Sequence, residues 1–242
     1  MKKITLLFAS LLCVAYIAVA QLKLYVYQND GTRTEFVAST VDSIAFSSIT
    51  DGPDQPDDPI KPVDPTNGHE WVDLGLPSGT KWATMNVGAE SPEDYGDYFA
   101  WGETTPKSSY TDSNYNYSSN PTTLPLDRDA AYTNWGTSWR MPTNAELKEL
   151  KDNCTWTRTT QNGVKGYKVT SKTNGNSIFL PAAGYRSSSD LGGAGSNGDY
   201  WSSSLDSDYS YCAYYLYFNS SYVDGGGSSR FCGRSVRPVM AK

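Results

Sequence analysis

Hydrophobic and polar residues alternate from the start of the region after residue 21, where Leu22, Leu24 and Val26 are separated by polar or aromatic residues. Period-two alternation predicts a β-strand, the Asp30-Gly31 dipeptide predicts a tight turn, and a second apolar run opens at Phe36. A further short run covers residues 41–46. The pattern predicts a small β unit over residues 21–48. Because so few strands are marginal alone, we expect it to dock on a partner or to donate a strand.

The next segment, residues 49–68, changes character completely. Prolines recur at every third position from 53 to 65 and alternate with aspartates. Proline favours extended backbone and the like charges repel one another, so this composition predicts a semi-rigid, solvated spacer. The remaining residues, 69–242, are long enough for one sizeable domain.

The clearest helix signal lies in the middle of that domain. Thr143 is followed three residues later by Glu146, which is a capping box, and Leu147, Leu150 and Cys154 then fall on one face. A shorter helix is predicted over residues 127–135, with Asp127 as its N-cap.

The rest of the domain has strand patterns. Two short strands are predicted around Pro77-Ser78-Gly79, and residues 104–125 are predicted to be a long polar surface loop. Asn174-Gly175 is a strong hairpin signal between strands at 166–171 and 177–180. Three more strands are predicted at 199–204, 212–218 and 234–239, with residues 225–227, all glycine, linking the last two. Helices followed by an antiparallel sheet indicate an α+β domain.

The first 20 residues resemble a secretory signal. Lys2 and Lys3 precede an apolar run, and Ala18-Val19-Ala20 matches a cleavage site. Leu12 precedes Cys13 where a lipoprotein signal has a small residue, so a lipid anchor on Cys13 is an alternative that the pattern does not favour. We therefore expect a secreted or cell-surface, outer-membrane-associated protein.

Charge and cysteine content agree with export. Loss of the two lysines leaves 18 basic and 26 acidic residues, a net charge of −8, and no basic stripe that would bind nucleic acid. Cys154, Cys212 and Cys232 remain after cleavage. The last two lie at the ends of neighbouring predicted strands, so we predict a Cys212–Cys232 disulfide with Cys154 left over.

Residues 184–239 are rich in Tyr, Ser, Gly, Asp and Asn. Tyr offers a large contact area with few torsions to order, and the small polar residues offer adaptable hydrogen bonding, which is typical of binding surfaces. Tyrosines that pack a β-rich core are the alternative interpretation of each residue taken singly.

Six ordered motifs in residues 69–240 resemble the Fibrobacter succinogenes major paralogous domain. They are residues 75–83 (Gly-Leu-Pro-Ser-Gly-Thr-Lys-Trp-Ala), 95–103 (Tyr-Gly-Asp-Tyr-Phe-Ala-Trp-Gly-Glu), 139–143 (Trp-Arg-Met-Pro-Thr), 179–184 (Phe-Leu-Pro-Ala-Ala-Gly), 200–203 (Tyr-Trp-Ser-Ser) and 233–239 (Gly-Arg-Ser-Val-Arg-Pro-Val). The resemblance implies a C-type-lectin-like fold, with one or two helices on a twisted antiparallel sheet and long loops that carry recognition. It also implies surface display and adhesion.

Some relatives with this fold are diversified by retroelements that exchange residues in a C-terminal stretch. The resemblance therefore raises the hypothesis that residues 207–234 vary, with Leu216, Phe218 and Val236 as framework.

The sequence offers little for catalysis, metal binding or a cofactor. His69 is the only histidine and borders the spacer, so it is expected to be an exposed residue at the start of the domain and supports neither a catalytic triad nor a zinc site. The acidic run at Glu90, Glu93, Asp94, Asp97 and Glu103 lacks the spacing of a calcium loop and is read as solvated. We predict no enzyme activity, no metal and no cofactor.

Two functions remain open. In the first, the domain binds a glycan or protein ligand on a cell surface; in the second, it is a structural subunit of a surface fibre or layer, with residues 21–48 contacting its neighbour. Arg230 is predicted to bind ligand carboxylates, and the aromatic candidates are the expected anchors. The candidate ligand-binding residues are Ser187, Asp190, Tyr209, Tyr211, Asn219, Tyr222, Asp224, Arg230 and Phe231.

Framework residues are predicted as a separate class. Trp71, Trp82, Trp101, Trp139 and Trp201 are expected in or near the core. Arg140 and Arg237 are expected to bind carboxylates or carbonyl groups within the domain rather than a ligand.

Overall fold

The structure is a computed structural model that describes residues 23–27, 33–37 and 66–240. The chain divides into two units, residues 1–60 and 61–242. The predicted signal peptide, the run at 41–46 and nearly all of the predicted spacer lie outside the described residues.

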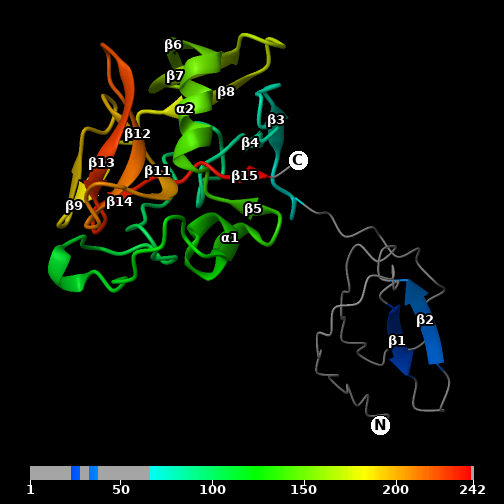
Figure 1. The fold of residues 1–242 in the computed structure, drawn as a ribbon. Helices are drawn as coiled ribbons and strands as arrows, with labels where there is room; N and C mark the ends of the chain where they lie inside the picture. Colours follow the sequence, from blue (N-terminus) through cyan, green and yellow to red (C-terminus); the bar gives the residue numbers. More distant parts are fainter. Residues whose placement is uncertain (1–22, 28–32, 38–65, 241–242) are drawn as a thin grey trace, which may run out of the picture. The chain divides into compact units, whose positions relative to one another are not determined.

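The described residues of the first unit form two paired strands, drawn in blue in Figure 1. Strand β1 (Lys23–Tyr27) pairs antiparallel with β2 (Arg33–Val37), with Lys23 opposite Val37. The predicted pairing of these two runs is confirmed, while the predicted turn at Asp30-Gly31 lies outside the described residues.

In the second unit, the first and last strands belong to one sheet. Its order is β3 (Trp71–Asp73), β4 (Lys81–Ala83), β15 (Val239–Met240) and β5 (Trp139–Arg140). The two strands predicted around Pro77-Ser78-Gly79 are β3 and β4. Because β15 pairs with both β4 and β5, the end of the unit closes against its beginning (Figure 1).

The helices begin at side-chain caps. Helix α2 (Asn144–Asn153) starts at the predicted capping box, with the Thr143 hydroxyl accepting from the backbone of Glu146. Helix α1 (Ala130–Trp135) follows the short 3₁₀ turn η3 (Leu126–Arg128). Its N-cap is Asp129, so the prediction of Asp127 was wrong by two residues. Asp129 lies in the extended conformation that lets its carboxylate accept from two helix amides, whereas Asp127 lies inside η3.

A second sheet contains β6 (Cys154–Gln161), β7 (Val164–Ser171) and β8 (Ser177–Pro181). The hairpin predicted at Asn174-Gly175 joins β7 to β8 and is confirmed. Strand β6 was not predicted. The signal that marks it is Asn162-Gly163, whose two left-handed residues make the β6–β7 turn.

The third sheet is formed by β11 (Gly198–Leu205), β12 (Cys212–Phe218) and β13 (Val223–Ser229). The first two were predicted. The three glycines expected to be a linker lie inside β13 instead, where they pair with residues 214–216 of β12. Ladder hydrogen bonds join backbone groups, so pairing with β12 gives a glycine segment strand geometry despite its low propensity.

A small sheet of β10 (Asp190–Gly192), β9 (Tyr185–Ser187) and β14 (Gly233–Arg234) lies next to it. The strand predicted over 234–239 is in fact two strands, β14 and β15. Between them the carbonyl groups of Val236 and Pro238 accept from the amides of Val87 and Ala83, and Pro238 has no amide of its own to donate.

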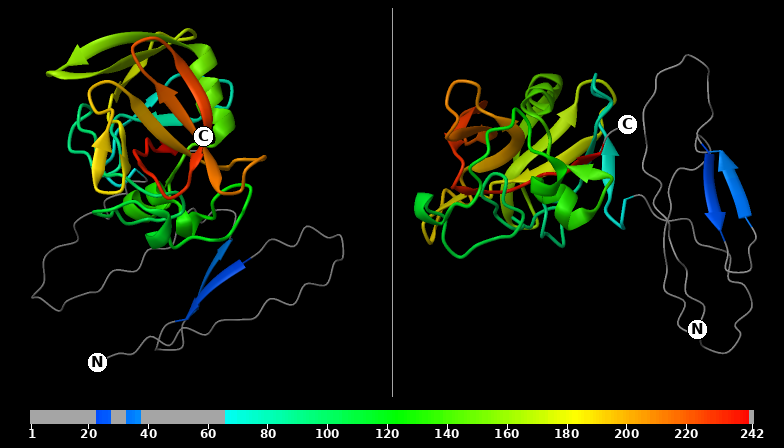
Figure 2. Two further views of the ribbon diagram at one scale, coloured as in Figure 1. Left: turned by 90° about the vertical axis from the view of Figure 1, so that its left-hand side faces the viewer. Right: turned by 60° about the horizontal axis from the view of Figure 1, so that its bottom comes forward.

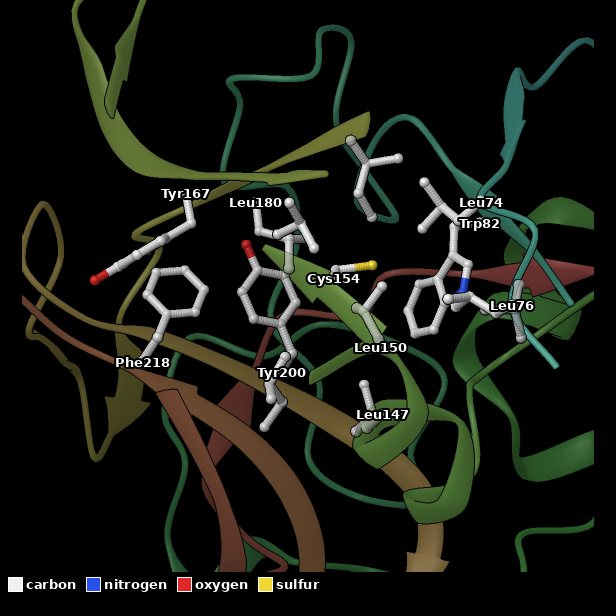
Figure 3. Close-up of a cluster of buried hydrophobic side chains, with 14 of the residues drawn as sticks. Leu74, Leu76, Trp82, Leu147, Leu150, Cys154, Tyr167, Leu180, Tyr200 and Phe218 are labelled. Carbon is white, nitrogen blue, oxygen red and sulfur yellow. The ribbon is translucent and has the colours of Figure 1, made fainter. Parts of the chain in front are cut away.

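Adjacent residues of β11 point into two different core clusters, as alternation along a strand requires. Tyr200 lies with Leu147, Leu150, Leu216 and Phe218 in one cluster (Figure 3). Trp201 lies in the other, with Trp101, Trp139 and Val236 among its members.

The predicted core tryptophans are confirmed with one exception. Trp82, Trp101, Trp139 and Trp201 are buried. Trp71 is 38% exposed, and the Lys81 ammonium group lies 3.9 Å from its ring centroid. Strand β3 is the edge of its sheet, so its side chains are covered less than those of β4. Two α-helices with antiparallel sheets in the described part of the second unit agree with the predicted α+β class.

Candidate functional site

The predicted ligand-binding residues separate to the two ends of the β12–β13 hairpin. Tyr209, Tyr211, Arg230 and Phe231 lie where β12 begins and β13 ends, while Asn219 and Tyr222 lie at the turn between the strands. A strand of this length spans roughly 20 Å. The two groups therefore cannot contact one small ligand together.

The β9–β10 hairpin joins the first of these groups. Arg186 of β9 pairs with Gly233, two residues beyond Phe231, so Ser187 and Asp190 lie near that end. Ser188 exchanges two backbone hydrogen bonds with Tyr110 of the 104–125 loop, at 2.8 and 2.9 Å. Figures 1 and 2 show this loop, in green, next to the yellow β9–β10 hairpin. We call this end of the second unit the pocket end.

A pocket of about 490 Å³ opens at the pocket end. Its walls carry four aromatic rings together with small polar side chains, and they come from the 112–120 segment and from the two sides of the β12–β13 hairpin. The lining residues are Asp112, Tyr115, Tyr117, Ser118, Asn120, Ser210, Tyr211, Ser229, Arg230 and Phe231.

Arg230 is a structural residue of this pocket. Its side chain makes five hydrogen bonds, one for each of its N–H donors. The acceptors are the Tyr115 hydroxyl, the Asn120 side-chain oxygen and the carbonyl oxygens of Tyr117, Ser119 and Ser210. The residue is only 4% exposed. The prediction that Arg230 offers donors to a ligand carboxylate was therefore wrong, because the 115–120 loop takes four of them and the Ser210 carbonyl group takes the fifth.

The aromatic rings beneath the guanidinium complete this arrangement. Its central carbon lies 4.8 Å from the ring centroid of Trp101 and 5.3 Å from that of Tyr115. Burial raises the pKa of Tyr115 to about 12, although Arg230 acts in the opposite direction. The hydroxyl is thus neutral at physiological pH, accepting from Arg230 and donating to the Trp101 carbonyl group at 2.6 Å.

Two exposed tyrosines lie at the rim. Tyr211 is 66% exposed and Tyr209 is 56% exposed, and their ring centroids are 5.7 Å apart. The Asp206 carboxylate accepts from the amides of Asp208 and Tyr209 and so orders the turn that carries them. The rim therefore offers aromatic surface on a turn that is held in place from below.

At the other end of the hairpin, the predicted residues contact their own chain. The Asn219 side-chain oxygen accepts from the amides of Ser221 and Tyr222, which closes the β12–β13 turn. Asp224 forms an ion pair with Lys151 of α2 at 3.1 Å. Asp224 and Tyr222 are both exposed, and Tyr222 is the exposed large hydrophobic side chain of this group.

A family model matches residues 115–239, just over half of the chain, and its description is "Domain of unknown function (DUF8237)". The chain belongs to the DUF8237 family. No curated protein and no solved structure matches it. The DUF8237 region includes every residue that lines the pocket except Asp112.

Among the pocket residues that were not predicted from the sequence are four of the DUF8237 region, namely Tyr115, Tyr117, Ser118 and Asn120. They lie in the segment that was predicted to be a surface loop. The available signal was the recurrence of tyrosine at 110, 115 and 117 in an otherwise polar stretch. Tyr110 and Tyr117 are buried, so this loop has aromatic anchors of its own.

The cysteines of the DUF8237 region are free. Cys154, Cys212 and Cys232 are all unpaired thiols, so the predicted Cys212–Cys232 bridge is not present in the structure. The antiparallel register places Ser229 opposite Cys212, and Cys232 lies in the turn beyond the ladder. Two cysteines near neighbouring strands are therefore not enough to predict a disulfide, because the two residues must also lie opposite each other.

The predicted roles of the framework arginines are confirmed. Arg140 donates to both carboxylate oxygens of Glu146, at 2.6 and 2.7 Å. Arg237 is buried and donates to the Asn86 side chain and to the carbonyl groups of Ala83, Thr84 and Phe179. Burial lowers the pKa of Arg237 to about 10, so the side chain is still charged at neutral pH.

His69 is half-buried, contrary to the expected exposure, because its ring stacks on Trp135 with centroids 3.6 Å apart.

Two residues of the acidic run, which was expected to be solvated, form hydrogen bonds with other residues of the chain. Asp94 accepts from the amides of Glu90 and Ser91, and Glu93 accepts from the side chains of Gln161 and Asn162. Within residues that the structure describes, no three metal-ligating side chains form a group, and no helix is both long and apolar enough to span a membrane.

Proposed function

We propose that this chain is a non-catalytic recognition protein that binds a glycan in the pocket beside Tyr211 and Phe231. The observation that carries the proposal is the combination of a highly exposed Tyr211 with a pocket whose wall is ordered by the buried Arg230. Neighbouring exposed tyrosines are typical of binding surfaces, and the loop beneath Tyr211 is already ordered before any ligand arrives.

The lining of the pocket favours a carbohydrate. Its volume of about 490 Å³ is in the usual range for small-ligand sites. Tyr and Phe rings can pack on the apolar faces of sugar rings, while the hydroxyl and amide groups of Ser118, Asn120 and Ser229 suit sugar hydroxyls. Because Arg230 has no spare N–H donor, a neutral sugar is favoured over an acidic one.

We also propose that the second unit has a C-type-lectin-like fold. Two features support this architecture. Its first and last strands pair in one sheet, and the motifs that carry the family resemblance supply buried framework residues such as Trp82, Trp101 and Trp201. The pocket is built instead from the segments between them. Tyr209 and Tyr211 are exposed whereas Leu216 and Phe218 are buried, a division that suits the hypothesis of a varied surface on a constant framework.

Export to the cell surface is part of the proposal and rests on the signal-like residues 1–20 and the Pro/Asp-rich segment that follows. A spacer of that composition suits a protein whose binding domain must reach beyond the surface that carries it.

A glycan array probed with the full chain, followed by titration of the retained sugar, tests the proposal. Tyr211→Ala and Phe231→Ala are expected to weaken binding at least tenfold. Tyr222→Ala is the matched control, because Tyr222 is 55% exposed but lies at the opposite end of the hairpin. An array without specific binding, or equal losses in all three variants, would contradict a glycan site in this pocket.

Assembly into a surface fibre is the second candidate, and one observation favours it. The described part of the first unit is a two-stranded hairpin, which is marginal in water without a partner. If residues 21–48 contribute a strand to a neighbouring molecule, the full chain will form polymers whose size rises with concentration. Removal of residues 21–48 should then leave monomers in light scattering.

A further inference from the structure

Strand β13 is an edge strand. It pairs with β12 on one side, and none of the described residues pairs with its other side. Figure 1 shows β13 at the border of its sheet, with α2 packed near the neighbouring strands. An edge strand presents unpaired backbone groups to which another extended chain can be added.

The register shows which backbone groups of β13 point away from β12. At the two limits of the ladder, Arg230 donates to the Tyr211 carbonyl group and Asn219 donates to the Tyr222 carbonyl group, both at 3.1 Å. Hydrogen-bonded and non-hydrogen-bonded pairs alternate in an antiparallel ladder. The N–H and C=O groups that face away from β12 are therefore those of Val223, Gly225, Gly227 and Ser229. Among them, the Gly225 amide donates to the Asp224 carboxylate and the Ser229 carbonyl group accepts from Cys232.

Two of the glycines in this edge are not required by the fold. A Cβ atom added to Gly225 would have no neighbour closer than 3.5 Å, and one added to Gly226 none closer than 3.6 Å. Neither residue has a positive φ. Glycine weakens a strand, and where it is not needed for the turn or the packing it often marks a site that another backbone approaches closely.

A groove of about 170 Å³ lies between α2 and this edge. Leu147, Tyr214 and Leu216 contribute apolar surface, and Lys148 and Lys151 contribute ammonium groups. Leu216 is directly opposite Gly225, so the missing side chain of Gly225 leaves space on the face that α2 covers.

The edge already binds one carboxylate, that of its own Asp224. This group, which is 63% exposed, accepts from the Gly225 amide at 2.8 Å and from the Lys151 ammonium group at 3.1 Å. Lys148 is exposed and forms no ion pair within the described ranges. An exposed ion pair is weak, so a carboxylate from another chain can replace Asp224 here.

We propose that β13 binds an extended acidic peptide segment of another protein as an additional strand. The peptide backbone pairs with Gly225 and Gly227. An aliphatic side chain opposite Gly225 enters the groove, and a carboxylate two positions away lies on the same face and contacts Lys148 or Lys151. This site is separate from the glycan pocket and does not depend on it.

A display library of random octapeptides, selected on the full chain and counter-selected on Gly225→Val, tests the proposal. The retained peptides should carry an aliphatic residue with an acidic residue two positions away, and should lack proline. In fluorescence anisotropy, Gly225→Val should weaken the best peptide at least tenfold while the melting temperature stays equal or rises. Gly226→Val, whose side chain points to the opposite face, should retain binding.

Two charge variants and one pocket variant complete the test. Lys148→Glu should weaken binding, and Asp224→Ala should strengthen it because the competing carboxylate is removed. Tyr211→Ala should have no effect. The proposal is wrong if no retained peptide depends on Gly225, if the retained peptides are basic, or if Tyr211→Ala abolishes binding, since the peptide would then occupy the pocket.

Discussion

The Nε–H group of Arg230 donates to the hydroxyl of Tyr115 across 2.8 Å, and this contact joins segments 115 residues apart. The same guanidinium group also holds residues 117–120 in place through hydrogen bonds to Tyr117, Ser119 and Asn120. Arg230 therefore connects two walls of the pocket, the 115–120 loop and the end of β13.

Arg230→Ala should release this loop. The substitution leaves several buried acceptors unpaired, so we expect a loss of about 3 kcal/mol or more in the free energy of unfolding. Hydrogen exchange of residues 104–125 should accelerate relative to α2. Urea unfolding and exchange mass spectrometry measure the two effects.

Arg186→Ala is the control for that experiment, because Arg186 lies on β9 at the same end and its guanidinium carbon is 5.2 Å from the Tyr98 ring centroid. It should change stability by less than about 1 kcal/mol. Equal effects of the two variants would show that Arg230 does not have the special role assigned to it.

Glu146 should make the fold sensitive to acid. Burial raises the pKa of its carboxyl group, but the bonds from Arg140, the Thr143 backbone and Thr80 outweigh burial and lower the pKa to about 2. A lowered folded-state pKa gives stability that is complete above the unfolded value near 4.5 and is lost as the pH falls toward 2. The loss should approach about 3 kcal/mol.

Urea unfolding measured from pH 7 to pH 2 tests this expectation. Glu146→Gln should be less stable than the parent at pH 7, and its stability should decline less between pH 4.5 and 2. Glu70→Gln, at an exposed position, should follow the parent curve. If Glu146→Gln keeps the full acid dependence, other carboxyl groups cause it.

Cys154 should resist alkylation in the folded chain. Burial raises the pKa of its thiol to about 11, and the residue is 3% exposed. Burial and, to a lesser extent, Asp206 also raise the pKa of Cys212. Since the thiolate is the reactive species, iodoacetamide at pH 8 should leave Cys154 unmodified until guanidinium chloride unfolds the protein. Peptide mapping by mass spectrometry locates the adducts, and rapid labelling of Cys154 under native conditions would contradict its placement in the core.

Gly102→Ala should be much more destabilising than Gly136→Ala. Both glycines have a positive φ, 79° and 100°, so alanine is strained at each. A Cβ atom at Gly102 would in addition overlap the Tyr117 ring. A Cβ atom at Gly136 would have no atom within 4 Å. We expect a further cost of about 2 kcal/mol at Gly102, measured as a lower melting temperature. Equal costs would mean that Tyr117 moves aside freely.

Local patterns predicted the elements whose signals are local. The capping box of Thr143 and Glu146, the hairpin at Asn174-Gly175 and the limits of β12 each depend on residues within one turn or one strand. The pattern failed at Gly225, where a strand forms because β12 provides a backbone partner. It failed at Trp71 as well, because an edge strand lacks a covering neighbour on one side.

By itself, the sequence determined the α+β class, most strands, the framework arginines and the concentration of tyrosine near the C-terminus. Only the tertiary structure decided which of those residues face solvent. Arg230 reads as a surface residue in a polar segment, yet it is buried against Trp101 and a loop more than 100 residues away. The burial of a charged side chain depends on the sum of long-range hydrogen bonds that replace its water, and no local periodicity records that sum.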